Sequence, residues 1–335
     1  MFKSKITGIG HYLPPRKVAN KDLETMMDTS DEWIRERTGI QERRWIEKGD
    51  GHTSAGMGVK AAEEAIANAG ITKNDIDFII FATLSPDYYF PGCGVLVQRD
   101  LGISTIGALD VRNQCSGFIY GLTIADQFIK SGTYKNILLI GSEVHSGALE
   151  KNTRGRGVSV IFGDGAGAVV ISREEGDGQG VLSTCLHSQG EFAEELCILR
   201  PSTTHWIPEI LEENNPDDQS WRAHMNGNFV FKHAITRMPE AIEEVLDKAD
   251  KKPENIDLMI AHQANLRIAD MVQKKFGFSD DRVFNNIQKV GNTTAASIPI
   301  AMYQAVQEGK LKRGDLLCLT AFGAGFTWGA ALLEY

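Results

Sequence analysis

The sequence predicts an α/β fold made of two related halves. Apolar runs of strand length alternate with helix-like segments along most of the chain, which is typical of α/β proteins with mostly parallel strands. Residues 61–80 match residues 241–260 without a gap, with seven identical residues among the twenty. Two further matches follow in the same order along the chain, so we infer duplication of one α/β unit rather than chance similarity.

The first half of the chain contains the elements of one such unit. The apolar run Ile6–Tyr12 predicts a strand, and Asn20 and Ser54 are plausible N-caps of the helices that begin there. The apolar run at 76–83 predicts a buried parallel strand. The other elements predicted for this half are helices at 20–27, 30–38, 54–69, 94–101 and 118–130, and strands at 108–111, 136–141 and 167–172.

The second half repeats this alternation from about Val181. We therefore predict an N-terminal half at 1–172 and a C-terminal half at 173–335. A segment at 199–224 interrupts the pattern with three prolines and an acidic run, which predicts a loop-rich insertion, either a lid or a mobile surface segment. The elements predicted for this half are helices at 228–248, 265–276 and 295–308, and strands at 256–261, 316–320 and 329–334.

The repeat also predicts where the two halves meet. Phe128–Gly132 matches Ala305–Gly309, and the offset of 177 between the two glycines places Asn292 opposite Cys115. A fold with pseudo-twofold symmetry would bring the two helix starts together at its centre. We therefore expect the partners of Cys115 near Asn292.

Composition bounds the class of protein. The chain has 335 residues, 42% hydrophobic and 24% charged, and its net charge of −9 without a long basic block argues against nucleic acid as a ligand. Five widely spaced cysteines without a CxxC pair favour a reducing cytosol and argue against a structural zinc site. We expect a cytoplasmic protein, since the chain has neither an apolar leader nor a run long enough to cross a bilayer.

Cys115 is the candidate nucleophile. It lies between the apolar run 106–111 and the helix-like segment 118–130, at a strand-to-helix junction where the helix dipole favours thiolate. Thiolate is the nucleophilic form of cysteine. The alternative interpretation is a small, buried and inert residue.

Two other polar residues occupy comparable positions. His262 follows the predicted strand at 256–261 and can carry a proton at neutral pH, and Asn292 precedes a helix and can donate its amide to a developing oxyanion. Open α/β sheets bind their ligands at such positions. His262 is otherwise a structural histidine, and Asn292 is otherwise a helix N-cap. The seven other histidines have no comparable placement.

Two glycine-rich segments carry weaker signals. Gly163–Gly167 lacks the GxGxxG spacing and precedes a strand, which excludes a dinucleotide-binding fingerprint. Phe322–Phe326 follows a strand, and its glycines allow a backbone amide to point at an oxyanion; an ordinary tight turn is the alternative.

Several motifs in order resemble the β-ketoacyl-[acyl carrier protein] synthase III family of the thiolase superfamily over nearly the whole chain. The matching motifs are Gly8–Pro14, Thr29–Ile34, Arg37–Ile40, Cys115–Gly117, Phe162–Gly167, Gly227–Asn228, Phe231–Lys232, His262–Ile268, Gly291–Thr293 and Gly323–Gly329.

This resemblance implies a duplicated, five-layered αβαβα thiolase fold, a homodimer, and a condensing enzyme of fatty-acid initiation. Cys115 would accept an acyl group from acyl-CoA, with the backbone amides of Cys115 and Ala324 binding the oxyanion. His262 and Asn292 would assist decarboxylation of malonyl-[acyl carrier protein], and the carbanion would attack the acyl-cysteine to give 3-oxoacyl-[acyl carrier protein], CO2 and CoA. Neither a metal nor a redox cofactor is implied, because CoA enters as part of a substrate.

The resemblance also assigns binding positions. Trp33 would stack on the CoA adenine, with Arg37 and Arg156 near the phosphates and Asn228 near the pantetheine. Phe90 would cross the dimer interface to close the partner's acyl pocket. The segment resembling the carrier-protein contact consists of Gln263, Ala264, Asn265, Leu266 and Arg267.

The chain departs from the family pattern at Asn113-Gln114, where small residues are usual, at Ala324, which replaces a glycine, and in the insertion at 199–224. Residues 83–87 and 112–117 also resemble quinolone-pathway relatives. The alternatives are therefore a specialised-metabolism relative with another acyl primer or acceptor, acyl transfer without condensation, and a non-catalytic subunit that binds acyl-CoA.

Overall fold

Two β-sheets organise the protein. The computed structural model describes residues 2–174, 180–202 and 219–335. The first sheet has the strand order β1-β7-β6-β4-β5, and the second has the order β11-β12-β13-β8. Their strands are β1 (Lys3–Tyr12), β4 (Phe78–Ala82), β5 (Gly107–Val111), β6 (Asn136–Glu143), β7 (Gly165–Glu174), β8 (Val181–Ser188), β11 (Leu258–Ala261), β12 (Leu316–Gly323) and β13 (Thr327–Glu334).

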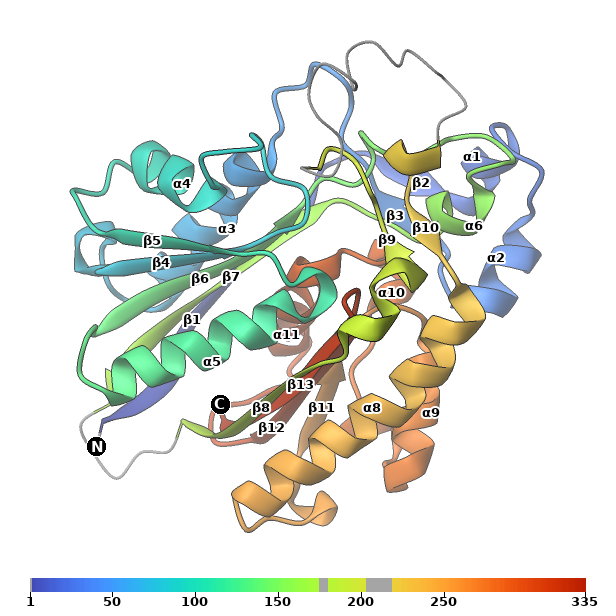
Figure 1. The fold of residues 1–335 in the computed structure, drawn as a ribbon. Coiled ribbons are helices and arrows are strands. Elements are labelled where there is room, and N and C mark those ends of the chain that lie inside the picture. The colour runs from blue at the N-terminus through green and yellow to red at the C-terminus, as the bar shows by residue number, and fades with distance from the viewer. Residues whose placement is uncertain (1, 175–179, 203–218) are drawn as a thin grey trace.

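Six long helices form three layers around these sheets (Figure 1). Helices α3 (Ser54–Asn68) and α4 (Cys93–Leu101) cover the outer face of the first sheet, and α8 (Gly227–Lys248) and α9 (Leu266–Phe276) lie on the outer side of the second. Helices α5 (Gly117–Lys130) and α11 (Ser297–Gln307) lie between the sheets. The predicted five-layered αβαβα arrangement is therefore the observed one.

Shorter elements complete the described chain. Strands β2 (Lys17–Ala19) and β3 (Glu42–Arg44) pair with each other, as do β9 (Leu196–Cys197) and β10 (His224–Met225). The short helices are α1 (Asn20–Glu24), α2 (Asp31–Thr38), α6 (Arg156–Ser159) and α10 (Ile287–Val290). 3₁₀ turns occur at 73–75, 114–116, 190–195, 219–221, 253–255, 280–282 and 294–296.

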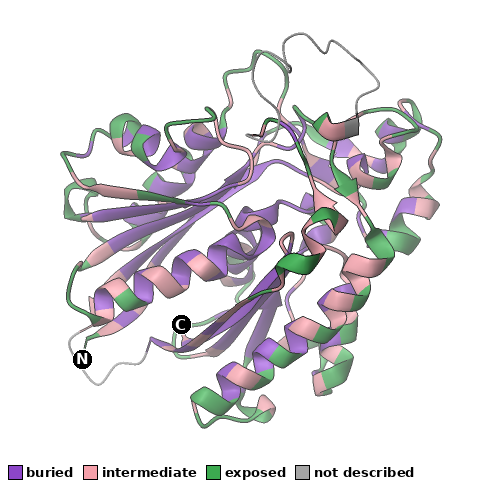
Figure 2. Ribbon diagram, viewed as in Figure 1, coloured by how far each residue is buried: buried purple, intermediate pink, exposed green. Residues whose placement is uncertain are grey.

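The core follows these layers (Figure 2). One apolar cluster fills the space between the two sheets, a second lies under α3 and α4, and a third lies under α8 and α9. Helix α5 is buried along most of its length, as expected for a helix between two sheets. In the described ranges, no helix is long and apolar enough to cross a bilayer.

The strand pairing is mixed, which corrects the prediction of mostly parallel strands. Four of the seven pairs in the main sheets are antiparallel, because β7 and β13 run against both of their neighbours. A short turn joins β12 to β13, and strands joined in this way pair antiparallel. The last strand of the first sheet ends at Glu174, and the first strand of the second sheet begins at Val181. This change of sheet lies close to the boundary that we placed at residue 172.

Two of the predicted helix caps are wrong. Thr53, one residue before Ser54, accepts the Gly56 N–H and caps α3. The Asn20 side chain is buried and donates to the Ile40 carbonyl, while its oxygen accepts from the Arg43 guanidinium. Asn20 therefore joins α1 to β3 instead of capping a helix.

The duplication is confirmed in structure, but the residue predicted to lie opposite Cys115 is three positions too early. Strand pairing matches Phe78 with Ile137 and, 180 residues later, Leu258 with Leu317. The same offset relates the 3₁₀ turns Gln114–Ser116 and Thr294–Ala296, so Ala295 and not Asn292 is opposite Cys115. Helix α11 is three residues shorter than α5, 11 against 14, so the offset of 177 holds only at the helix ends.

The insertion predicted at 199–224 falls largely outside the described residues. The structure describes residues 199–202 and 219–224 of it, with a 3₁₀ turn at Gln219–Trp221 and the first residue of β10 at His224. Its predicted role as a lid or mobile segment stays a prediction.

The packing of β1 on α3 predicts a steric effect on stability. A Cβ at Gly10 would lie 2.2 Å from the Ala61 carbonyl oxygen and 2.5 Å from the Ala65 nitrogen, both in the α3 backbone. We expect Gly10→Ala to lower the free energy of unfolding by about 2 kcal/mol or more. Gly157→Ala, where a Cβ meets nothing within 4 Å, should change it by less than about 0.5 kcal/mol. Urea unfolding measures both, and equal effects would contradict the proposed steric conflict.

Candidate active site

Cys115 lies in the 3₁₀ turn Gln114–Ser116 between β5 and α5 and is buried. This turn packs against the matching turn Thr294–Ala296 and against β12, so both halves of the fold enclose the cysteine. A Cβ at Gly323 would lie 2.6 Å from the Cys115 Cβ and 3.2 Å from its Sγ. Glycine at the end of β12 therefore allows the close approach of strand and nucleophile.

Burial dominates the electrostatics of Cys115. It raises the pKa of the thiol to about 12, and the nearby Glu143 carboxyl acts in the same direction. The backbone N–H groups of Cys115 and Ala324 lower this pKa by hydrogen bonding to the sulfur, but they are the smaller effect. The expectation that the helix start makes Cys115 a thiolate is therefore wrong for the free protein, because desolvation outweighs the dipole.

The same two amides are candidates for binding an anion. The backbone N–H groups of Cys115 and Ala324 come from different halves of the fold and lie close enough to the sulfur to lower its pKa. An acyl group on that sulfur would place its carbonyl oxygen beside them. Two converging amides are the usual arrangement for stabilising the oxyanion of acyl transfer.

His262 follows β11 and is buried and neutral. Burial, followed by the proximity of His145, lowers the pKa of His262 to about 3. Its Nδ1 lies 2.6 Å from the Ser297 hydroxyl at the start of α11. Its Nε2 is buried and has no hydrogen-bond partner in the described part of the chain. An unpaired buried nitrogen is costly and marks a position where a ligand atom can bind.

Asn292 lies next to the Thr294–Ala296 turn and connects the two halves. Its N–H donates to the Ile161 carbonyl, and its carbonyl accepts the Gly163 N–H, both at 2.9 Å. Its Oδ1 accepts the Thr294 N–H at 2.8 Å. The capping interpretation of Asn292 is wrong, because Thr293 is the N-cap of the Thr294–Ala296 turn and Ala296 is the N-cap of α11. The bond to the Thr294 N–H uses Oδ1 and fixes the side chain without using the amide nitrogen as a donor.

Two residues that the sequence interpretation missed belong to this neighbourhood. His145, which we did not single out, binds the Gly163 carbonyl through Nδ1 and the Thr294 hydroxyl through Nε2, both at 2.8 Å. Glu143 is fully buried at the end of β6 and accepts hydrogen bonds from Thr83, Leu84 and Ser85. Burial raises the pKa of Glu143. An acidic residue ending an apolar strand was the available sequence signal.

Trp33, Arg37 and Arg156 form one cluster, as the resemblance predicts. The Arg37 and Arg156 guanidinium carbons lie 4.4 Å and 4.8 Å from the centre of the Trp33 ring. The ring is half-buried, and Arg37 is exposed. An aromatic face with two guanidinium groups suits a nucleotide with phosphates. Asn228 is exposed at the start of α8.

The segment Gln263–Arg267 has a buried and an exposed part. The Gln263 side chain is buried, donates to the Ala261 carbonyl at 2.8 Å and accepts the N–H groups of Asn286 and Ile287. Its predicted contact with a carrier protein is therefore wrong, since both ends of its amide are engaged inside the protein. Asn265 donates to the Arg37 carbonyl at 2.9 Å, and Arg267 is exposed above the Phe231 ring.

Phe90 lies on the connection between β4 and α4 and is 80% exposed. Tyr88 and Tyr89 beside it are also exposed, as are Val95 on α4 and Leu109 on the edge strand β5. Exposed aromatic residues next to a sheet edge are typical of a protein–protein interface.

Comparisons with known proteins agree with this geometry. Residues 109–190 match the family described as 3-Oxoacyl-[acyl-carrier-protein (ACP)] synthase III, and residues 246–335 match its C-terminal counterpart. The chain is 46% identical to Beta-ketoacyl-[acyl-carrier-protein] synthase III of Aquifex aeolicus (strain VF5) over 332 residues, 99% of each chain. It is 44% identical to the protein of that name from Aliivibrio fischeri, with the same coverage.

Solved structures give the same result. The crystal structure of 3-oxoacyl-[acyl-carrier-protein] synthase III from Aquifex aeolicus VF5 superposes with a TM-score of 0.90 at 45% identity, covering 99% of this chain and 100% of that one. The priming β-ketosynthase of the R1128 polyketide pathway gives a TM-score of 0.88 at 30% identity, covering 99% and 96%. These similarities confirm the predicted α/β fold over the whole chain.

The raised thiol pKa predicts how Cys115 reacts in the free protein. We expect alkylation of Cys115 by iodoacetamide to be slow near pH 7 and to rise about tenfold per pH unit up to about pH 10, because the thiolate fraction rises in that proportion below the pKa. Peptide mass spectrometry against pH measures the rate, with Cys115→Ser as the background. A plateau below about pH 8 would show a stabilised thiolate and contradict this account.

Proposed function

Because the chain belongs to the β-ketoacyl-[acyl carrier protein] synthase III family, we propose that it joins an acyl-CoA primer to malonyl-[acyl carrier protein] and so initiates fatty acid biosynthesis. Members of this family are acyl-transferring condensing enzymes. The observation that carries the proposal is the position of Cys115 at a helix start enclosed by both halves of the fold, beside the backbone N–H groups of Cys115 and Ala324.

Acyl transfer to Cys115 is the first step. The sulfur attacks the thioester carbonyl of acyl-CoA, and the amides of Cys115 and Ala324 hold the carbonyl oxygen as it becomes negative. The carbon–sulfur bond to CoA breaks, and the proton of the Cys115 thiol passes to the departing CoA sulfur. The Cys115 thiol therefore supplies the proton that CoA needs as the leaving group.

Decarboxylation and condensation form the second step. The bond between the malonyl α-carbon and its carboxylate breaks, CO2 leaves, and the electron pair moves onto the thioester oxygen as an enolate. In our proposal His262 Nε2–H and the Asn292 amide donate to that oxygen. The α-carbon then attacks the acyl-cysteine carbonyl, the enolate oxygen becomes a carbonyl again, and Cys115 leaves as a thiolate while 3-oxoacyl-[acyl carrier protein] forms. The thiolate takes a proton from water, which restores the resting thiol.

Ser297 positions His262 for this role. If the Ser297 hydroxyl donates to Nδ1, the neutral imidazole carries its proton on Nε2, which is the nitrogen without a partner in the described residues. Burial keeps the ring neutral, because it lowers the pKa of His262 to about 3. His262 then acts as a neutral hydrogen-bond donor, as histidine can when its tautomer is fixed by a neighbour.

The substrates would bind between the Trp33 cluster and Cys115. Trp33, Arg37 and Arg156 would hold the nucleotide of CoA, and Asn228 would contact its pantetheine. Asn265 is bonded to the Arg37 carbonyl, so the CoA cluster adjoins the half-buried Leu266 and the exposed Arg267, which would meet the acidic carrier protein. No metal or redox cofactor takes part in this scheme.

The chain would act as a cytoplasmic homodimer. The exposed side chains of Val95, Leu109 and Phe90 lie along the β5 edge of the first sheet, where a second copy would cover them. Phe90 would then close the partner's acyl pocket and limit primer length.

Intact mass spectrometry tests the first step. Incubation with acetyl-CoA or longer acyl-CoAs should add the mass of the acyl group to the wild-type protein and not to Cys115→Ala. Absence of any adduct would contradict the nucleophile. Malonyl-[acyl carrier protein] should then remove the adduct and yield a 3-oxoacyl carrier, whereas an acyl-enzyme that ignores it would favour the alternative acceptor or simple acyl transfer.

Variants of His262 and Ser297 test the division of labour. We expect His262→Ala to keep acylation of Cys115 and to lower condensation by about 100-fold or more. Ser297→Ala should lower condensation by about tenfold without changing acylation, because the tautomer is no longer fixed. Separate single-turnover assays of the two steps measure these effects, and equal loss of both steps in either variant would contradict the assignment.

A further inference from the structure

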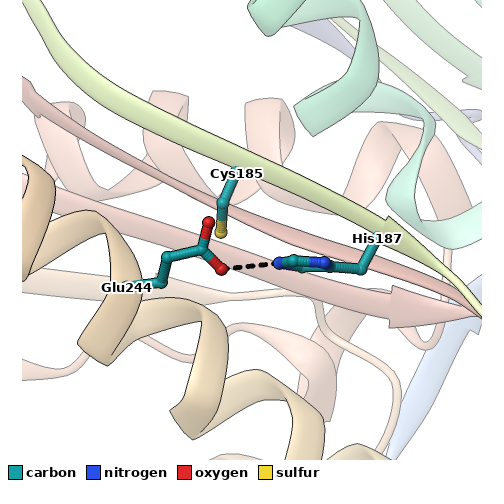
Figure 3. A group of neighbouring side chains, drawn as sticks. All are labelled: Cys185, His187 and Glu244. Atoms are coloured by element: carbon teal, nitrogen blue, oxygen red, sulfur yellow. Dashed lines mark hydrogen bonds and ion pairs between the residues drawn. The ribbon is translucent and has the colours of Figure 1, made fainter.

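A second cluster of reactive side chains lies on the outer side of the C-terminal sheet. Cys185 and His187 are two residues apart on β8, so both side chains face α8, and the Glu244 side chain extends from α8 toward them (Figure 3). The proposed mechanism uses none of the three. Their candidate ligand atoms all lie within 4.8 Å of one another.

The contacts within the cluster fix its geometry. His187 Nε2 lies 2.6 Å from a Glu244 carboxylate oxygen, Oε2. The Cys185 thiol donates to the Ala241 carbonyl at 3.4 Å and also interacts with the Glu244 carboxylate. The other Glu244 oxygen, Oε1, binds the Lys248 ammonium group at 2.8 Å. A carboxylate oxygen, the imidazole and the sulfur therefore lie close enough together to bind one ion.

The three side chains of the cluster differ in their exposure to solvent. Cys185 is 3% exposed, whereas the side chains of His187 and Glu244 are 39% and 35% exposed. The His187 ring stacks on Trp328 of β13, with ring centres 5.4 Å apart. This packing holds the imidazole in place beside the buried Cys185.

We propose that Cys185, His187 and Glu244 bind one Zn²⁺-like transition-metal ion, with water as a fourth ligand. Sulfur, imidazole and carboxylate are the three ligand types that zinc uses, and three protein ligands with an open position are typical of an exchangeable site. On binding, the Cys185 proton would leave to solvent, and His187 Nε2 would exchange its bond to Glu244 for the metal.

The donor set also selects the class of ion. Magnesium and calcium prefer oxygen ligands, so a site containing a thiolate and an imidazole disfavours both. The Lys248 ammonium group binds Glu244 Oε1, and its positive charge would repel a bound cation. We therefore expect an exchangeable ion and not a permanent structural one. This proposal departs from the sequence analysis, which expected no metal.

Cobalt(II) is a visible probe of this site. Titration of chelator-treated protein in a Cys115→Ser background, which removes the nucleophile, should bind one equivalent. The cobalt complex should show a thiolate-to-cobalt charge-transfer band and the visible absorption bands of tetrahedral cobalt(II). Zn²⁺ should abolish these bands by displacing cobalt, and Mg²⁺ should not.

Adding Cys185→Ser should abolish the charge-transfer band, and Glu244→Gln should weaken binding by about tenfold or more. Adding Cys197→Ser, which removes a half-buried thiol outside the cluster, is the matched control and should change nothing.

A second measurement needs no substitution in the cluster. Zn²⁺ should slow alkylation of Cys185 in the folded protein, measured by peptide mass spectrometry, without slowing alkylation of Cys197. A titration without a charge-transfer band, a band that survives Cys185→Ser, or alkylation of Cys185 that ignores Zn²⁺ would each overturn the proposal. None of these outcomes depends on condensing activity, so the site and the proposed function can fail independently.

Discussion

The contact between two short 3₁₀ turns, Gln114–Ser116 and Thr294–Ala296, sets the position of every group in the candidate active site. Each turn begins with a residue of positive φ, 42° at Gln114 and 50° at Thr294, which are sterically costly for side-chain-bearing residues. Each turn starts a helix that lies between the sheets, and each packs on a strand of the other half. A Cβ at Gly323 would collide with Cys115, and one at Gly141 would lie 2.4 Å from the Ala295 carbonyl.

Because each turn packs on the other half of the fold, neither half contains the whole candidate site. The nucleophile and one oxyanion amide belong to the N-terminal turn, whereas the Ala324 amide, His262 and Asn292 come from the C-terminal half. Cys115 and His262 are both neutral at rest, because burial raises the pKa of Cys115 and lowers that of His262. In the proposed mechanism negative charge would develop on the two thioester oxygens as the substrates react, and fixed donors would stabilise it without reorganising, which is the condition for electrostatic catalysis.

Local patterns predicted much of the fold and only part of the site. Apolar periodicity located the main strands, and the spacing of Cys115, His262 and Asn292 beside strand ends predicted their neighbourhood. The residue of the second half that corresponds to Cys115 was placed three positions too early, because α5 and α11 differ in length. The sequences of the two helices do not show where the difference lies. His145 and Glu143 were missed because their importance comes from contacts with Thr294 and with the 83–85 segment, which are far away in the sequence. The buried role of Gln263 likewise depends on Asn286 and Ile287, which no local pattern shows.

The most direct test of this account is a crystal structure of the protein after reaction with acetyl-CoA. We predict an acetyl group on the Cys115 sulfur whose carbonyl oxygen accepts hydrogen bonds from the backbone N–H groups of Cys115 and Ala324, with His262 Nε2 and the Asn292 amide facing the empty position for the second thioester. An acetyl oxygen bound instead by His262 and Asn292 would contradict the central claim that amides from the two halves form the oxyanion site.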